Sequence, residues 1–244
     1  MPYFKIIKID ATDSTNLLMR QRYLSNLCED GEVLSATSQI KGRGQHNSVW
    51  KSETGKNLTF SVYRDFKNFS IKNPFLISCL VSLSVKTALE SFSLKKIKVK
   101  WPNDIMSHDK KLCGLLIENI FKGSHLSSSI IGIGLNVNQK VFKDLPNASS
   151  MYGISGQSFD LDEVLNSCLV ALNSTLQLLE KSDKKIIKLY EKSLYRMNKP
   201  STFKANGILF TGVIKGVTRE GLLKVQVEDE KIVLYNLKSI KLMN

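Results

Sequence analysis

The stretch QIKGRGQHNSVWKSETGKN, residues 39–57, combines glycines and cations in a way that suits an anionic ligand. Gly42, Gly44 and Gly55 allow the backbone to reach positive φ and to approach a bound molecule closely. Arg43 and Lys56 add cationic hydrogen-bond donors to the same segment. Three interpretations fit these residues: a loop around a phosphate, a basic loop on nucleic acid, or a surface loop without a ligand.

Three further segments place polar residues beside apolar runs. They are DSTN at 13–16, KWPND at 100–104 followed by KKLCGLLIE at 110–118, and GIGLNVN at 132–138. GRG or DSTN alone is a weak signal, since DSTN also suits a plain helix cap. KWPND followed by K-L-x-G-x-L-x-E is a specific pair. The combination therefore carries more information than any single segment.

The periodicity predicts the elements that must position these residues. Strands are expected at 3–9, 33–38, 58–63, 97–101, between PND and HDKK, at 112–120 and at 128–138. Helices are expected after DSTN, from Asn73 and Pro74 to about Phe92, from Asp160 to about Leu179, and over 184–196. Asn73 and Asp160 are the expected caps. Strands joined by tight turns predict a mixed, largely antiparallel sheet with flanking helices.

After residue 198 the pattern changes to short strands, at 210–217, 222–227 and 231–236. Residues 223–227 alternate apolar and polar side chains, as expected for a strand with one buried face. We therefore expect two domains, 1–197 and 198–244, the second a small barrel.

In their order and spacing, the four segments resemble the catalytic domain of biotin–protein ligases, which activate biotin with ATP and attach it to a lysine of a carrier protein. The region after 198 resembles the SH3-like C-terminal domain of that family. The resemblance implies an α+β fold, with a class II aminoacyl-tRNA synthetase-like catalytic domain and an SH3-like β-barrel. It also implies the substrates biotin and ATP, the cofactor Mg²⁺, and a biotin carboxyl carrier protein as acceptor.

The same resemblance assigns roles to residues that match the family motifs. Arg43 and Lys111 match the catalytic residues. The expected biotin-binding residues are Ser14, Thr15, Asn16, Gln39, Gly42, Arg43, Gly44, Gln45, Lys111 and Gly114, and the expected ATP-binding residues are Trp50, Lys56, Asn57, Asn103, Asp104 and Asn136. Two roles fit Asp104: holding Mg²⁺ through water, or accepting a proton from the incoming lysine.

These residue types suit the implied chemistry. The reaction brings a carboxylate to the α-phosphate of ATP, so positioned cations must hold two anions together. Arg43 offers a planar fork of donors, and Lys111 a compact charge. The ureido ring of biotin presents one acceptor and two N–H donors, which short hydroxyl and amide side chains can pair.

The sequence departs from the family pattern at two places. Arginine-rich members carry further arginines after GRG, whereas this chain has Gln45, His46, Asn47 and Ser48; we expect a looser hold on the adenylate. The catalytic strand is expected from residue 3, so we expect no preceding helix-turn-helix domain and no DNA binding.

Composition sets the remaining expectations. The formal net charge of +13 permits an acidic protein or nucleic-acid partner. The four cysteines lack metal-ligand spacing and are expected to be reduced thiols. No apolar run suits a signal peptide or a membrane span, so a cytoplasmic protein is expected. We also expect a monomer or a weak homodimer. Two other functions are alternatives to that of a biotin–protein ligase. One is a lipoate or octanoate ligase or transferase of the same fold, and the other is a nucleic-acid-binding module.

Overall fold

A computed structural model describes residues 4–45, 48–67, 69, 71–143, 145–180 and 182–243. The helices are α1 (Thr15–Leu24), α2 (Phe75–Ser91), α3 (Met151–Ser155), α4 (Leu161–Leu176) and α5 (Asp183–Ser193), with 3₁₀ turns at Gln177–Glu180 and Glu228–Glu230. The strands are β1 (Lys5–Thr12), β2 (Glu32–Gln39), β3 (Leu58–Asp65), β4 (Ile97–Lys100), β5 (Asp104–Ser107), β6 (Lys110–Lys122), β7 (His125–Leu135), β8 (Pro200–Ala205), β9 (Ile208–Val217), β10 (Leu223–Gln226), β11 (Ile232–Tyr235) and β12 (Lys241–Leu242).

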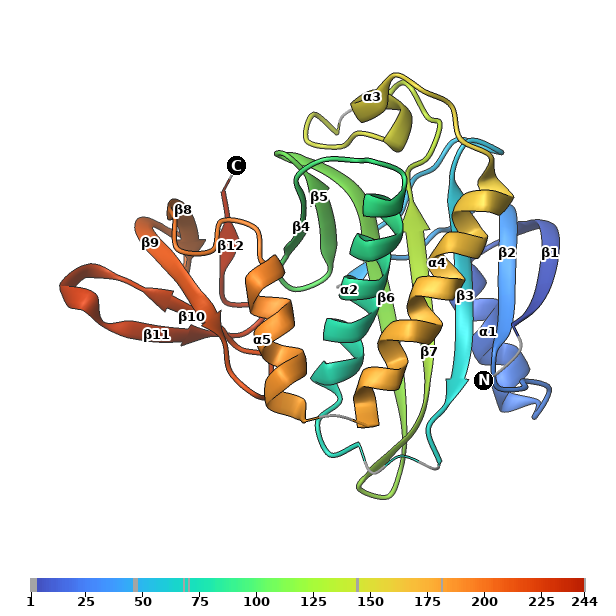
Figure 1. Ribbon diagram of the computed structural model, residues 1–244, viewed down its shortest axis with the longest axis horizontal. Coiled ribbons are helices and arrows are strands. Elements are labelled where there is room, and N and C mark those ends of the chain that lie inside the picture. The colour runs from blue at the N-terminus through green and yellow to red at the C-terminus, as the bar shows by residue number, and fades with distance from the viewer. Residues whose placement is uncertain are drawn as a thin grey trace.

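The larger sheet has seven strands in the order β1-β2-β3-β7-β6-β5-β4. β1 and β2 are parallel and joined through α1, whereas every other neighbouring pair is antiparallel. The mixed, largely antiparallel sheet predicted from the sequence is therefore confirmed. Figure 1 shows α2, α4 and α5 in front of this sheet and α1 behind it.

The two faces of the sheet differ in chemistry because side chains alternate along each strand. In β3, Leu58, Phe60 and Val62 belong to the main hydrophobic core with α2 and α4. The intervening Thr59 and Ser61 are buried on the opposite face. On the face that carries α1, this part of β3 therefore presents short polar side chains. Short side chains leave space for a cavity over the sheet.

The capping residues behave largely as predicted. Asp160 Oδ1 accepts the N–H of Glu163 at 2.9 Å at the start of α4. Asn73 Oδ1 accepts the N–H of Phe75 at 3.2 Å, with Pro74 between them. Ser14 is at the N-cap position of α1 but makes no side-chain capping bond. Instead, Gln39 Oε1 accepts the N–H of Thr15 at 2.8 Å, so the last residue of β2 caps this helix.

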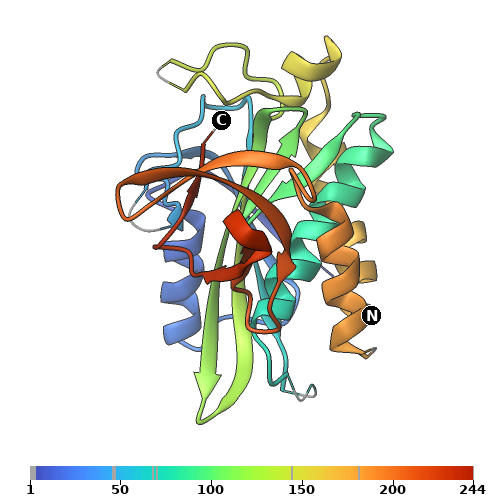
Figure 2. The same cartoon turned by 90° about the vertical axis from the view of Figure 1, so that its left-hand side faces the viewer.

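The C-terminal strands form a second, five-stranded antiparallel sheet in the order β11-β10-β9-β8-β12, which Figure 2 shows in front of the larger sheet. This fits the predicted SH3-like domain. Side chains of the larger domain hold it: Trp101 Nε1 donates to Gly221 O at 3.0 Å, Asn73 Nδ2 donates to Arg219 O at 2.6 Å, and Glu191 Oε1 accepts from Val217 N at 3.0 Å. The predicted boundary between residues 197 and 198 lies in the link between α5 and β8.

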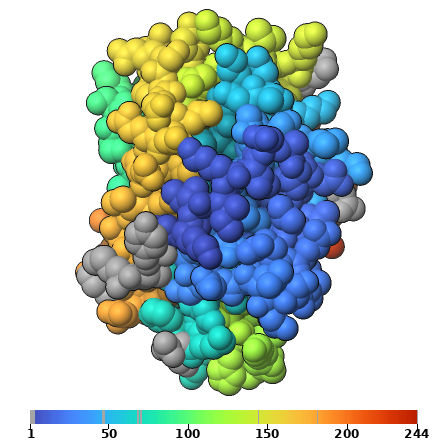
Figure 3. Space-filling view, turned by 90° about the vertical axis from the view of Figure 1, so that its right-hand side faces the viewer, coloured from blue at the N-terminus to red at the C-terminus, as the bar shows by residue number. Residues whose placement is uncertain are grey.

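The opposite end of the molecule is formed by the N-terminal third, the blue surface in Figure 3, with α4 beside it. Lys8 Nζ lies 2.6 Å from Asp162 Oδ2 and joins β1 to α4. The sequence analysis missed α3, which is one short turn of helix, and placed the end of the 160–179 helix beyond Leu176, where the chain tightens into a 3₁₀ turn. No helix among the described residues is long and apolar enough to cross a membrane.

Candidate active site

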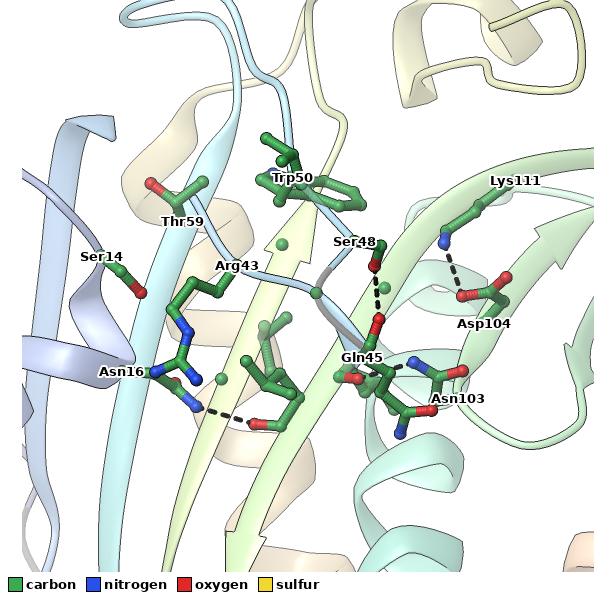
Figure 4. Close-up of a pocket in the computed structure, with 18 of the residues that line it drawn as sticks. Ser14, Asn16, Arg43, Gln45, Ser48, Trp50, Thr59, Asn103, Asp104 and Lys111 are labelled. Atoms are coloured by element: carbon green, nitrogen blue, oxygen red, sulfur yellow. Dashed lines mark hydrogen bonds and ion pairs between the residues drawn. The ribbon is translucent and has the colours of Figure 1, made fainter. Parts of the chain in front are cut away.

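A cavity of about 670 Å³ lies over the polar face of the sheet, where most of the predicted site residues meet. Its lining includes Ser14, Thr15, Asn16, Gln39, Arg43, Gly44, Gln45, Trp50, Asn103, Asp104, Lys111 and Gly114. Figure 4 shows these side chains converging from the start of α1, the loop after β2, the turn before β5 and the start of β6. The GRG, DSTN, PND and K-L-x-G segments therefore form one site.

Glycines make the floor of the cavity. The strand register places Thr59, Gly134 and Gly114 in one row across β3, β7 and β6, and Ser61, Gly132 and Leu116 in the next. A Cβ on Gly132 would lie 2.2 Å from Asn16 Oδ1, and one on Gly134 would lie 2.5 Å from the Trp50 ring. Glycine is needed at both positions because these two side chains lie directly on the sheet.

One end of the cavity is a network of short polar side chains. Ser61 Oγ lies 2.6 Å from Asn16 Oδ1 and 2.8 Å from Thr15 Oγ1. Thr15 Oγ1 lies 3.2 Å from Gln39 Oε1, the oxygen that also caps α1. Because Ser14, Thr15, Asn16 and Ser61 are all buried, this end can pair several polar atoms of a ligand away from water.

Positive charge gathers at the other end. Lys111 Nζ lies 2.6 Å from Asp104 Oδ1, and the pair is drawn at the right of Figure 4. Lys241, from the C-terminal domain, also lines the cavity. Burial lowers the pKa of Lys100; Asp104 raises it, and the nearby charges of Lys111 and Lys241 lower it further. Three lysines around one carboxylate make a site that favours an added anion.

The glycine loop lies across this cavity. Arg43 pairs with Val49 as an isolated bridge, and Trp50 N donates to Gly42 O at 2.9 Å, so the loop doubles back on itself. In Figure 4 the Arg43 side chain extends from the loop into the cavity toward Asn16. Gly42 does not line the cavity, but a Cβ there would lie 2.4 Å from Trp50 O. Gly42 therefore permits the chain reversal. Residues 45–48 are the segment in which this sequence lacks the arginines of the family pattern. Within it, His46 and Asn47 lie outside the described residues.

Trp50 separates the main cavity from a second one of about 250 Å³, which it also lines together with Asn136 and the loop residues Phe142, Leu145 and Pro146. Its indole Nε1 is buried and has no partner among the described residues, and the same holds for Asn136 Oδ1. Buried polar atoms are nearly always paired. One free donor and one free acceptor beside an apolar slot suit a flat, polar-edged ring.

Two residues predicted for ATP binding lie elsewhere. Lys56 is exposed and lines neither cavity. Asn57 is buried, but its amide is used within the protein: Nδ2 donates to Gln139 Oε1 at 2.6 Å, and Oδ1 accepts from Val137 N at 3.0 Å. Asn57 thereby fixes the loop that follows β7. Asn57 belongs to the same segment as Arg43 and Trp50, but the sequence does not show that its side chain points away from the cavity.

Sequence reasoning also missed lining residues. Thr59 lines the cavity, and Ser61 supports Thr15 and Asn16 from the same face of β3. Strand alternation would have indicated both residues if the buried face had been known. Lys100 stands in the KWPND segment itself and lines an adjoining cavity with Asp104 and Lys241. Leu237 and Lys241 reach the site only because the C-terminal domain docks there, and no local pattern announces that contact.

The fold and the site together define a mixed-sheet α+β domain with a deep, cation-lined cavity and a small β-domain at its rim. The model of the biotin/lipoate A/B protein ligase family matches residues 9–136, just over half of the chain. The chain belongs to this family.

Solved structures support the assignment. A biotin protein ligase from Aquifex aeolicus, in complex with biotin and ATP, superposes with a TM-score of 0.83 and 27% identity over 99% of this chain and 100% of that one. A biotin acetyl coenzyme A carboxylase synthetase from Helicobacter pylori, with bound biotinylated ATP, shares the fold at a TM-score of 0.67 and 19% identity, covering 95% of this chain and 100% of that one.

Sequence relatives point the same way. The bifunctional ligase/repressor BirA of Bacillus spizizenii is 27% identical over 84% of this chain. The biotin–[acetyl-CoA-carboxylase] ligase of Mycobacterium tuberculosis is 27% identical over 68% of this chain. The chain spans 64% of the length of the first relative and 61% of the second.

Proposed function

We propose that this protein is a biotin–protein ligase: it activates biotin with ATP to biotinyl-5′-AMP, releasing pyrophosphate, and transfers biotin to a lysine of a biotin carboxyl carrier protein. One observation carries the proposal: a buried hydroxyl and amide network at one end of the cavity faces cations at the other end. That order of groups matches biotin, which has a ureido ring at one end and a carboxylate at the other. The ligands named with the Aquifex aeolicus relative agree with it.

In the first step a biotin carboxylate oxygen attacks the α-phosphorus and pyrophosphate leaves. Thr15, Asn16 and Gln39 pair the ureido ring and fix the direction of the acid. Lys111 leaves Asp104 and pairs with the anions of the substrates. The Arg43 side chain, which extends toward Asn16 in Figure 4, turns toward the same end to add its guanidinium there. The reacting groups are held together and their charge is compensated.

The second cavity is assigned to adenine. Trp50 offers a ring face and a free indole N–H, and Asn136 Oδ1 can accept from the exocyclic amine. The phosphates then extend toward Lys100, Lys111 and Lys241. Because Asn57 and Lys56 line neither cavity, their contribution to ATP binding is indirect, through the loops they hold.

Mg²⁺ fits the phosphate end on the chemistry of the donors present. Asp104 is the one carboxylate among the residues that line the main cavity, and Mg²⁺ usually binds one or two carboxylates together with substrate phosphates and water. Asp104 would hold the ion, which would neutralise phosphate charge.

In the second step the acceptor lysine nitrogen attacks the acyl carbonyl and AMP leaves. The lysine must lose a proton, and Asp104 lies where it can accept one once Lys111 pairs with the adenylate. An excess of thirteen positive charges favours the approach of an acidic acceptor domain. The four free thiols fit a reducing, cytoplasmic compartment.

The test is incubation with ATP, Mg²⁺, biotin and an acceptor domain, read by avidin blot. Arg43→Ala and Lys111→Ala are expected to lose labelling by about 100-fold or more, while Lys41→Ala, on an exposed lysine paired with Asp13, serves as the charge-matched control. ATP–pyrophosphate exchange with biotin, lipoate or octanoate tests the choice of acid. Exchange driven by lipoate or octanoate alone would replace biotin in the proposal.

A further inference from the structure

Glu118, the last residue of the K-L-x-G-x-L-x-E segment, has no role in the reaction described above. It lies two residues beyond Leu116 on the cavity face of β6, half-buried, opposite the fully buried Ile130 of β7. Among the described residues it forms no ion pair, and the hydrogen bond it accepts comes from Asn16 Nδ2, at 3.1 Å. Partial burial of a carboxylate without a cation opposes folding, so stability does not account for Glu118, and its hydrogen bond with Asn16 is the contact that can explain it.

The Asn16 side chain can point its amide in either of two directions, and its neighbours decide which. An ionised carboxylate and a main-chain carbonyl only accept hydrogen bonds. Glu118 Oε2 and Leu116 O, the second acceptor at 3.0 Å, therefore both require the amide nitrogen. The oxygen must then face Ser61, whose hydroxyl lies 2.6 Å away.

This orientation puts an acceptor on the cavity floor. Asn16 Oδ1 lies 2.2 Å from the position of a Cβ on Gly132, directly above the strand. A carbonyl oxygen has two lone pairs, and Ser61 uses one. The other is available to a ligand N–H. If the Asn16 amide were reversed, its NH₂ group would face the N–H of the ligand. Two donors cannot form a hydrogen bond with each other.

We propose that Glu118 is a positioning residue that acts through Asn16: it holds Asn16 Oδ1 as an acceptor over Gly132 and so favours an acid whose ring carries N–H donors. This inference rests on the proposed function and deepens it, because it names what separates biotin from acids that lack a ureido ring. Glu118 touches neither ATP nor the reacting carboxylate in this account.

The test measures biotin binding by calorimetry, which requires no turnover, and separate KM values for biotin and ATP in pyrophosphate exchange. Glu118→Leu is expected to raise the biotin Kd and KM about tenfold or more, with the ATP KM and kcat within about twofold of wild type. Glu118→Gln, which still offers an acceptor oxygen, is expected to lie close to wild type. Glu163→Gln, at an exposed position on α4, removes the same charge as a control.

A double-mutant cycle identifies the intermediary residue. If Glu118 acts through Asn16, Glu118→Leu adds no further loss of biotin binding in an Asn16→Ala background. Asn16→Asp places a second carboxylate against Glu118 and is expected to weaken biotin binding. Adding Glu118→Gln, whose amide can donate to the new carboxylate, is expected to restore part of the biotin affinity. This second pair keeps the test decisive if Glu118→Leu does not fold.

Additive losses in the cycle, or an ATP KM that rises as much as the biotin KM, would overturn the inference while leaving the proposed function intact. Failure of the wild-type protein to bind biotin would overturn the proposed function itself, and the two failures are therefore distinguishable.

Discussion

Lys111 Nζ and Asp104 Oδ1 lie 2.6 Å apart, so the cation assigned to the substrate carboxylate and α-phosphate is already paired. Both side chains are partly exposed, and such pairs contribute only about 0–1 kcal/mol to the free energy of unfolding. The pair is therefore better understood as a contact that keeps the Lys111 side chain directed at the cavity. An anionic ligand can displace Asp104 at low cost.

Asp104→Asn and Lys111→Gln are expected to slow different steps of the reaction. Lys111→Gln removes the compensating charge, so adenylate formation should fall by about 100-fold or more. Asp104→Asn frees Lys111, so biotin binding in the absence of ATP should be unchanged or tighter, whereas transfer to the acceptor lysine should slow. Single-turnover assays of adenylation and transfer separate the steps, and equal losses in both steps for Asp104→Asn would contradict this division.

Gly134 is expected to be intolerant of even a methyl group. A Cβ there would lie 2.5 Å from Trp50 Cε2, so Gly134→Ala must displace the indole that divides the two cavities. We expect the ATP KM to rise about tenfold or more, with a change in tryptophan fluorescence. Trp50→Leu should relieve the clash, so Gly134→Ala should cost less in that background; an equal cost in both backgrounds would mean that the indole is not the obstacle.

The adenylate is expected to dissociate faster than in arginine-rich relatives, because Gln45 and Ser48 replace potential cations in the loop. The described part of this turn is held by its own bonds, Ser48 N and Oγ to Gln45 O at 3.0 and 2.7 Å. Release of labelled adenylate after a chase with unlabelled biotin measures the off-rate. Gln45→Arg should slow release, and a wild-type off-rate as slow as that of this variant would contradict the prediction.

The sequence predicted the strands of the large sheet because its strands and turns are strongly patterned. The family motifs pointed to Thr15, Asn16, Arg43 and Lys111, and all four line the main cavity. It could not place Asn57, whose amide turns inward to Val137 and Gln139. A side chain's direction depends on strand register and on which loop packs against it. Both depend on the tertiary structure and cannot be derived from the local sequence.

The same limit explains the contribution of the C-terminal domain. The sequence predicted β9, β10 and β11 but not β8 or β12. Lys241 and Leu237 become site residues only through docking against the KWPND turn, where the Trp101 indole donates to Gly221 O. Glu118 was visible in the sequence as part of a segment. The sequence alone does not place it beside Asn16, where the structure has it accept a hydrogen bond from Nδ2.

Alkaline pH is expected to destabilise the fold through its buried thiols. Burial raises the pKa of Cys168 from 9.0 to about 12 and that of Cys28 to about 11, and it raises the pKa of Cys79 and Cys113 as well. The folded state therefore keeps protons that the unfolded chain releases above about pH 9. Stability contributed by the neutral thiols is complete below that pH and is lost as pH rises toward the folded pKa values.

Urea denaturation with reductant at pH 8, 9 and 10.5 measures this loss. The free energy of unfolding should fall across the series, and Cys168→Ala, which removes one buried thiol, should make the fall shallower. A flat or rising profile between pH 8 and 10.5 would be inconsistent with the raised pKa values.

Asn73 is expected to couple the start of α2 to the C-terminal domain, because one side chain serves both. Its Oδ1 accepts from Phe75 N and its Nδ2 donates to Arg219 O. Asn73→Ala loses both bonds and should cost about 1–3 kcal/mol in urea denaturation. Asn73→Ser keeps a capping oxygen and loses the bond between domains, so its smaller cost isolates that bond. Asp160→Ala removes a cap alone, that of α4, and should cost about 1 kcal/mol. If Asn73→Ser unfolds at the same urea concentration as wild type, the Asn73–Arg219 bond does not stabilise the domain contact.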